Sequence, residues 1–241
     1  MRGLISEQLL TDSMKLSFVH ILLFGCAMAS CNSNPDTTAK TDSTVSNTVT
    51  IPSDSIKKAG TIVFFGNSLT AGYGIEPTQA FPALINRRLD SLDLPYSVVN
   101  AGVSGETSSG GNARIDWILR QPVDIFVLEL GGNDGLRGIP VEETKKNLQT
   151  IIDKVRAKYP SAKIILAGMQ IPPNMGQRYT TAFRNIFPEL AKKNNATLIP
   201  FLLQGVGGEA TLNLDDGIHP TPEGHRILAE NVWEVLQPLL Q

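Results

Sequence analysis

The chain has 241 residues, of which 41% are hydrophobic, so it can bury the core of one α/β domain with tails, whereas two full domains would be cramped. Its formal net charge is -2, and it has no block of five or more like charges. Nucleic-acid binding needs a concentrated positive charge, so this function is excluded. Both cysteines, Cys26 and Cys31, lie near the N-terminus, which excludes a disulfide, a thiolate nucleophile or a cysteine metal site in the rest of the chain.

Residues 1–31 have the pattern of a secretory signal, with a basic start, a short apolar stretch and small residues before a cysteine. The last five residues, Ala-Met-Ala-Ser-Cys, resemble a bacterial lipobox, in which Cys31 would become the lipidated first residue of the mature protein. A competing site ends at Cys26 but has the bulky Phe24 close to it, and a cleaved signal without a lipid is the other alternative. We therefore expect export across the inner membrane, to the periplasm or to the outer membrane as a lipoprotein.

The composition changes after the predicted signal. Residues 32–58 are rich in Ser, Thr, Asn, Asp and Lys and contain few large apolar side chains. Such a segment cannot bury enough surface to offset the entropy of ordering, so it is predicted to be a flexible tether. One globular domain is expected over residues 59–241, held close to a membrane if Cys31 is lipidated.

Short apolar runs alternate with amphipathic helical patterns throughout this domain. Five strands separated by helices predict a parallel sheet with helices on both faces. The expected strands are residues 61–66, 96–100, 123–130, 163–167 and 197–201. The expected helices are residues 78–92, 112–120, 141–158, 177–194 and 221–236.

The first predicted strand ends abruptly in Gly66-Asn67-Ser68. A serine at this place has its hydroxyl at the carboxyl edge of the sheet, where open α/β folds bind their ligands. Ser68 is therefore the first candidate for a nucleophile. The motif alone also fits a serine that merely caps the next helix or bonds its own turn, so partners elsewhere in the chain must decide.

The choice of base is narrow because the chain has three histidines. His20 lies in the apolar N-terminal run and His225 lies inside the last predicted helix, which leaves His219 as the candidate. Asp216 precedes His219 by three residues, and a loop of this length can turn its carboxylate back onto the imidazole. The carboxylate would accept the proton on Nδ1 and leave Nε2 free to take the proton of Ser68. Taken alone, Asp-x-x-His also fits a solvated surface turn.

Acyl transfer also needs hydrogen-bond donors for the developing oxyanion. Gly105, after the second strand, can bring its backbone N–H close because no side chain blocks the approach. Asn133, after the third strand, can offer its side-chain amide. Glycine loops and Asn turns are common, but both of these follow strands and are expected at the same edge of the sheet as Ser68.

Together these residues resemble the four sequence blocks of the SGNH hydrolases, also called GDSL esterases. The resemblance spans nearly all of residues 61–240 and is strongest to the secreted bacterial thioesterase, lysophospholipase and arylesterase group. The blocks are Gly66-Asn67-Ser68-Leu69, Gly105, Gly131-Gly132-Asn133-Asp134 and Asp216-Gly217-Ile218-His219, in that order.

The resemblance implies a flavodoxin-like three-layer α/β/α fold, the SGNH hydrolase fold, and a mechanism that uses no metal or cofactor. It assigns Ser68 as nucleophile, His219 as base and Asp216 as the residue that orients the base. It also implies an oxyanion hole made by the backbone N–H groups of Ser68 and Gly105 and the amide of Asn133. One departure is Asn67, where the family usually has an aspartate; asparagine can still bond the turn but carries no charge.

The expected activity is hydrolysis of small-molecule carboxylic esters, thioesters or lysophospholipids through an acyl-enzyme. A carbohydrate O-acetyl esterase of the same family and a non-catalytic lipid-binding module are the alternatives. The loop after the fourth strand and the residues that follow the Asn133 loop are rich in apolar side chains. Such side chains favour acyl chains over sugars as substrates. The residues expected to contact substrate are Leu136, Ile139, Met169, Ile171, Pro172 and Met175.

Overall fold

The computed structural model describes residues 60–240. The predicted signal peptide with Cys26 and Cys31, and the predicted tether over residues 32–58, lie outside the described residues. In the described part of the chain, no helix is long and apolar enough to cross a membrane.

The expected five-stranded parallel sheet is confirmed, in the order β2-β1-β3-β4-β5. The central strands read as unbroken apolar runs because helices cover both of their faces. Phe64 packs against the ring of Phe81 at 5.5 Å between centroids, whereas Phe65 points to the opposite face and lies under the guanidinium of Arg114 at 4.1 Å. The strands are β1 (Gly60–Gly66), β2 (Tyr96–Gly102), β3 (Ile125–Glu129), β4 (Lys163–Ala167) and β5 (Thr197–Ile199).

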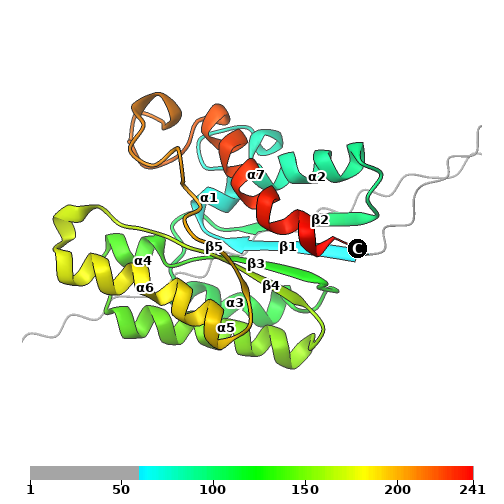
Figure 1. Ribbon diagram of the computed structural model, residues 1–241, viewed down its shortest axis with the longest axis horizontal. Helices are drawn as coiled ribbons and strands as arrows, with labels where there is room; N and C mark the ends of the chain where they lie inside the picture. Colours follow the sequence, from blue (N-terminus) through cyan, green and yellow to red (C-terminus); the bar gives the residue numbers. More distant parts are fainter. Residues whose placement is uncertain (1–59, 241) are drawn as a thin grey trace, which may run out of the picture. The chain divides into compact units, whose positions relative to one another are not determined.

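The helices form two layers around the sheet (Figure 1), so the three-layer α/β/α architecture is confirmed. Figure 1 shows α2 and α7 over one face and α3, α5 and α6 over the other. A short helix, α1 (Ser68–Ala71), directly follows β1, and another, α4 (Gly132–Leu136), follows β3. The long helices are α2 (Phe81–Ser91), α3 (Ser108–Ile118), α5 (Val141–Lys158), α6 (Gln177–Lys193) and α7 (Pro222–Leu236).

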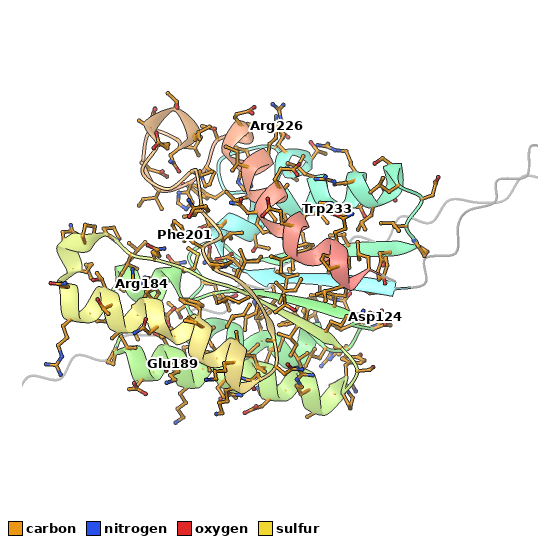
Figure 2. All side chains as sticks on the ribbon, viewed as in Figure 1. Asp124, Arg184, Glu189, Phe201, Arg226 and Trp233 are labelled. Atoms are coloured by element: carbon orange, nitrogen blue, oxygen red, sulfur yellow. The ribbon has the colours of Figure 1, made fainter. Side chains whose placement is uncertain are left out.

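Neighbouring helices of each layer also contact one another through surface side chains, among them Trp233 of α7 and Glu189 of α6, which are labelled in Figure 2. The guanidinium of Arg88 on α2 lies 4.5 Å from the ring centroid of Trp233 on α7. On the other face, Lys145 of α5 forms an ion pair with Glu189 of α6 at 2.5 Å. Exposed ion pairs contribute little to stability, so the buried faces of the helices supply most of the energy of each layer.

Helix α3 begins earlier than the sequence predicts, at Ser108 rather than residue 112. Thr107 caps it by accepting a hydrogen bond from the N–H of Gly110 at 3.3 Å. Glycine is needed inside the helix because a Cβ at Gly111 would lie 2.3 Å from the side chain of Leu130. The glycines that suggested a loop therefore allow α3 to approach the sheet closely.

The strand order places a topological switch point at β1, which has β2 on one side and β3 on the other. The chain leaves β1 toward β2 and leaves β2 across β1 toward β3, so the connections diverge at the carboxyl end of β1. Open α/β folds bind their ligands in the crevice at such a point. Ser68 lies two residues beyond the end of β1, directly at this crevice.

Candidate active site

The turn that carries Ser68 is built by its two neighbours. Asn67 caps α1 by accepting a hydrogen bond from the N–H of Leu69 at 3.0 Å. At Gly66 a Cβ would lie 2.1 Å from the hydroxyl of Thr70 and 2.7 Å from the carbonyl oxygen of Glu129, so only glycine leaves room for the turn to pack against β3. Ser68 is 7% exposed, and its position on this rigid turn is fixed by the backbone rather than by a mobile loop.

The structure brings Ser68, His219 and Asp216 together from opposite ends of the domain. The Oγ of Ser68 lies 2.9 Å from Nε2 of His219. On the other side of the ring, Nδ1 of His219 lies 2.6 Å from Oδ2 of Asp216. These distances form one hydrogen-bonded chain, in which Nδ1–H donates to the carboxylate and Nε2 accepts from the serine hydroxyl.

Asp216 is held by its own loop. Its Oδ1 accepts hydrogen bonds from the backbone N–H groups of Ile218 at 2.9 Å and of His219 at 3.0 Å. The backbone N–H of His219, its imidazole and the N–H of Ile218, in this order, lower the pKa of Asp216 to about 2. The carboxylate is therefore ionised at neutral pH and presents a negative charge to the imidazole.

The loops after β2 and β3, the two strands next to β1, carry the other two expected donors. Gly105 has a φ of +80°, and its carbonyl accepts a hydrogen bond from Arg137 at 3.0 Å. Asn133 uses one amide N–H to donate to the carbonyl of Glu106 at 2.9 Å. Within residues 60–240, no hydrogen bond uses the N–H of Ser68 or of Gly105. All three expected donors thus have an N–H available.

A buried polar network that the sequence did not predict connects these two loops. Asp134 is fully buried and accepts hydrogen bonds from the backbone N–H of Ser108 at 2.8 Å and from its hydroxyl at 2.5 Å. The hydroxyl of Thr144 donates to the same carboxylate at 3.3 Å. Because Asp134 follows Asn133 and Ser108 lies three residues after Gly105, the network fixes one donor loop relative to the other.

Glu129 lies directly beneath the nucleophile turn, at the end of β3, and is 1% exposed. Burial raises the pKa of this carboxyl to about 7, although hydrogen bonds from Thr70 and Asn67 act in the opposite direction. The sequence showed Glu129 as an isolated charge in an apolar strand but did not indicate its partners.

Tyr73 is another neighbour that the sequence did not reveal. Its ring lies 4.5 Å from the imidazole of His219, between centroids, although the side chain is 51% exposed. The same loop contacts the segment before Asp216, because a Cβ at Gly74 would lie 2.5 Å from Leu214. Gly72 and Gly74, on either side of Tyr73, indicate a loop in the sequence. They do not indicate which residues this loop contacts.

The remaining histidine of the domain is structural. His225 is 1% exposed, and its Nδ1 accepts a hydrogen bond from the backbone N–H of Phe81 at 3.2 Å. Burial lowers its pKa to about 4, so the ring is neutral at neutral pH. Among residues 60–240, no group of three or more His, Cys, Asp and Glu side chains could hold a metal ion.

The residues expected to contact substrate lie in different surroundings. Met169 is 5% exposed and belongs to the core, whereas Leu136 is 42% exposed. Ile171 is half-buried and packs on α4, where a Cβ at Gly135 would lie 2.4 Å from it. Ile139 and Met175 are also half-buried, and Pro172 is exposed.

A groove of about 460 Å³ lies beside the loop after α4. Met175 and Tyr179 line it, and the hydroxyl of Tyr179 donates to the carbonyl of Ile139 at 2.6 Å. The other lining residues are Val141, Gly176, Gln177, Arg178 and Ala182.

Comparisons with known proteins show the family of this chain. The model of the GDSL-like Lipase/Acylhydrolase family matches residues 64–227. Esterase TesA of Pseudomonas aeruginosa is 42% identical over 183 residues, 76% of this chain and 90% of that protein. Thioesterase 1/protease 1/lysophospholipase L1 of Escherichia coli K12 is 40% identical over 183 residues, 76% of this chain and 86% of that protein. The crystal structure of esterase EstA from Pseudoalteromonas sp. is 32% identical, with a TM-score of 0.71 over 75% of this chain and 98% of that one. The resemblance to the SGNH hydrolases is thereby confirmed, and the chain belongs to the GDSL-like lipase/acylhydrolase family.

Proposed function

We propose that this protein hydrolyses carboxylic esters or thioesters through an acyl-enzyme on Ser68. The observation that carries the proposal is the hydrogen-bonded chain from Ser68 through His219 to Asp216, at 2.9 and 2.6 Å. A serine that only capped its helix would need neither an imidazole at its hydroxyl nor an ionised carboxylate behind that imidazole. Relatives named esterase, thioesterase and lysophospholipase support the same reaction class.

In the first half of the reaction, Oγ of Ser68 attacks the carbonyl carbon while its proton passes to Nε2 of His219. Asp216 stabilises the imidazolium that forms. The tetrahedral intermediate then breaks the bond to the leaving group, and the imidazolium returns the proton to the departing alkoxide or thiolate. The products of this half are an alcohol or thiol and the acylated serine.

In the second half, His219 takes a proton from a water molecule that attacks the acyl carbon, and the serine leaves with that proton restored. Both tetrahedral intermediates place negative charge on the former carbonyl oxygen. We assign the N–H groups of Ser68 and Gly105 and the amide of Asn133 as the donors to this oxyanion, because each has an N–H available.

A fluorophosphonate probe tests the nucleophile directly. The EstA structure is of the esterase inhibited by monoethylphosphonate, which supports the choice of probe. We expect one molecule of probe to attach to this protein at Ser68, located by mass spectrometry of the digested protein. Attachment at any other residue, or no attachment to active protein, would refute Ser68 as the nucleophile, whereas a folded protein with neither labelling nor esterase activity would favour a non-catalytic lipid-binding module.

Replacing Asn133 with alanine should lower kcat by about a hundredfold to a thousandfold and change KM far less. The amide is expected to bond the oxyanion more strongly in the transition state than the carbonyl in the ground state, so its loss should affect the chemical step. Steady-state kinetics with one soluble ester would measure both constants. An unchanged kcat would remove Asn133 from the oxyanion hole.

We propose that medium to long acyl chains are the preferred substrates. The half-exposed Leu136, the half-buried Ile139 and Met175, and the largely apolar groove beside them favour an acyl chain over a sugar. Met169 can act only as support for this region, because it is buried in the core.

A series of p-nitrophenyl esters of increasing chain length tests this preference. We expect kcat/KM to rise with each added methylene group until the site is full. The reason is that burying one methylene contributes up to about 0.8 kcal/mol to binding. Met175→Ser should flatten the rise while leaving the acetyl ester almost unaffected. Faster turnover of acetylated sugars than of any ester of about eight carbons or more would replace this proposal by a carbohydrate O-acetyl esterase.

We also propose that the exported protein is anchored to a membrane through a lipid on Cys31. Metabolic labelling with a fatty acid in a bacterial host should mark the full-length chain, and Cys31→Ser should abolish the mark because the lipid needs that thiol. Cys26→Ser is the matched control and should keep it. Loss of the mark in the control instead would move the site to Cys26, and no mark in any variant would indicate a cleaved signal without a lipid.

A further inference from the structure

Arg114 on α3 links three residues at the carboxyl ends of β1 and β2. Its Nε and Nη2 donate to the two carboxylate oxygens of Glu106 at 2.6 and 2.5 Å. Nη2 also donates to the carbonyl of Ala101, near the end of β2, at 2.8 Å, and to that of Gly66, the last residue of β1, at 3.4 Å. The side chains of Arg114 and Glu106 are 22% and 7% exposed, so water has little access to the pair.

Glu106 in turn supports two of the three oxyanion donors assigned above. It directly follows Gly105, so a shift of its backbone shifts Gly105 as well. Its carbonyl accepts the hydrogen bond from Nδ2 of Asn133 at 2.9 Å, which sets the orientation of that side-chain amide. Arg114 therefore connects the ends of β1 and β2 to the residue on which both donors depend.

Packing against the core does not hold the tip of this loop. Val103, Ser104 and Gly105 are all exposed. The backbone N–H of Glu106 donates to the carbonyl of Val103 at 3.1 Å, which closes the turn but does not attach it to the sheet. The side chain of Glu106 points inward instead, and its ion pair with Arg114 provides that attachment.

The planar fork of an arginine suits this role better than a lysine would. A guanidinium holds its N–H groups in one plane, so it can bind both oxygens of a carboxylate and still donate to a carbonyl. This plane lies over the ring of Phe65, 4.1 Å from its centroid, which restricts how far it can tilt. An ammonium is a single point of charge and could not keep Glu106 and both strand ends at fixed distances.

We propose that the Arg114–Glu106 pair positions the oxyanion hole of the proposed active site. The pair acts through the backbone at Gly105 and the amide of Asn133, so both of its members are positioning residues. The inference rests on the proposed function and adds the residues that set the geometry of its donors. Because the negative charge on the oxygen develops in the transition state, displaced donors should weaken transition-state binding more than substrate binding.

Two variants test the pair. Arg114→Lys keeps the charge and loses the fork, whereas Glu106→Gln keeps the shape and loses the charge. Each should lower kcat with a soluble ester by about tenfold or more and change KM by less than about threefold. A trifluoromethyl ketone, which forms a tetrahedral adduct with a nucleophilic serine, should bind more weakly by about the factor by which kcat/KM falls. The double variant should be about as slow as the slower single variant, because the pair acts as a unit.

Arg88→Lys is the matched control. Arg88 also bonds a glutamate, Glu230, at 2.7 Å and lies 4.5 Å from the ring centroid of Trp233, but on α2, over the other face of the sheet. The control should keep kcat within about twofold of the wild type, whatever its melting temperature. Equal falls in kcat for Arg88→Lys and Arg114→Lys would indicate a general effect of lost stability and would overturn the proposal.

A second measurement asks whether Arg114 acts through the donors. In an Asn133→Ala background, Arg114→Lys should lower kcat by about threefold rather than tenfold, because one of the donors that it positions is already absent. Melting temperatures measured on the same variants would show how much stability each change removes. The same factor in both backgrounds would mean that Arg114 does not act on the oxyanion hole.

The outcomes separate this inference from the proposed function. If Arg114→Lys does not fold, Glu106→Gln decides, and wild-type kcat in that variant would overturn the positioning role. If the phosphonate probe does not label Ser68 of the wild type, the proposed function fails and the inference fails with it. If Ser68 is labelled and both variants keep wild-type kcat, only the positioning role is wrong.

Discussion

Replacing Ser68 with alanine should give a folded protein whose turnover of esters is slower by about ten-thousandfold or more. The change removes one oxygen atom from the end of the hydrogen-bonded chain with His219 and leaves Gly66 and Asn67, which shape the turn, in place. Without this oxygen no acyl-enzyme can form, and the oxyanion donors alone supply the residual rate. Steady-state rates with a soluble ester and a thioester would measure the loss.

Ser104→Ala is the matched control. This serine is exposed on the neighbouring loop, one residue before Gly105, and lies outside the hydrogen-bonded chain. The control should keep nearly full activity and should still be labelled by the phosphonate probe at Ser68. If the Ser68 variant retained more than about a hundredth of the activity while remaining folded, the reaction would have to use another nucleophile or an activated water.

Most of the fold could be predicted because its strands and helices follow simple patterns. The predicted boundaries of α5 and β4 agree with the structure because Pro140 precedes the helix and an unbroken apolar run forms the strand. Strand β5 is shorter than predicted and ends at Ile199, because Pro200 has no N–H to donate to the sheet. The short helix α4 was missed because two glycines in five residues give no helical pattern.

The residues of the site could be predicted where a short motif carries them. Ser68 follows a strand, and Asp216 and His219 share one loop, so local sequence was sufficient to place them at one edge of the sheet. Glu129 and Tyr73 acquire their partners through contacts between distant segments, 62 residues apart for Glu129 and Asn67. No periodicity or spacing in the sequence specifies such contacts, and they became visible only in the folded chain.

The Asp216→Asn variant should fold and should lower kcat by about a thousandfold. The side-chain oxygen of asparagine can still accept the N–H groups of Ile218 and His219, so the loop should keep its shape. Its amide nitrogen would then face Nδ1 of His219 and donate to it. The imidazole would carry its proton on Nε2, and a protonated Nε2 cannot accept the proton of Ser68.

Asp215→Asn is the matched control for this prediction, because the neighbouring aspartate is also exposed and carries the same charge. The two variants change the net charge equally and differ only in whether the carboxylate meets the imidazole, 2.6 Å away in the case of Asp216. The control should have wild-type kcat and KM within about twofold, since a surface charge is screened by salt. Equal losses in the two variants would mean that the effect is a general one of charge, and Asp216 would then have no special role in orienting His219.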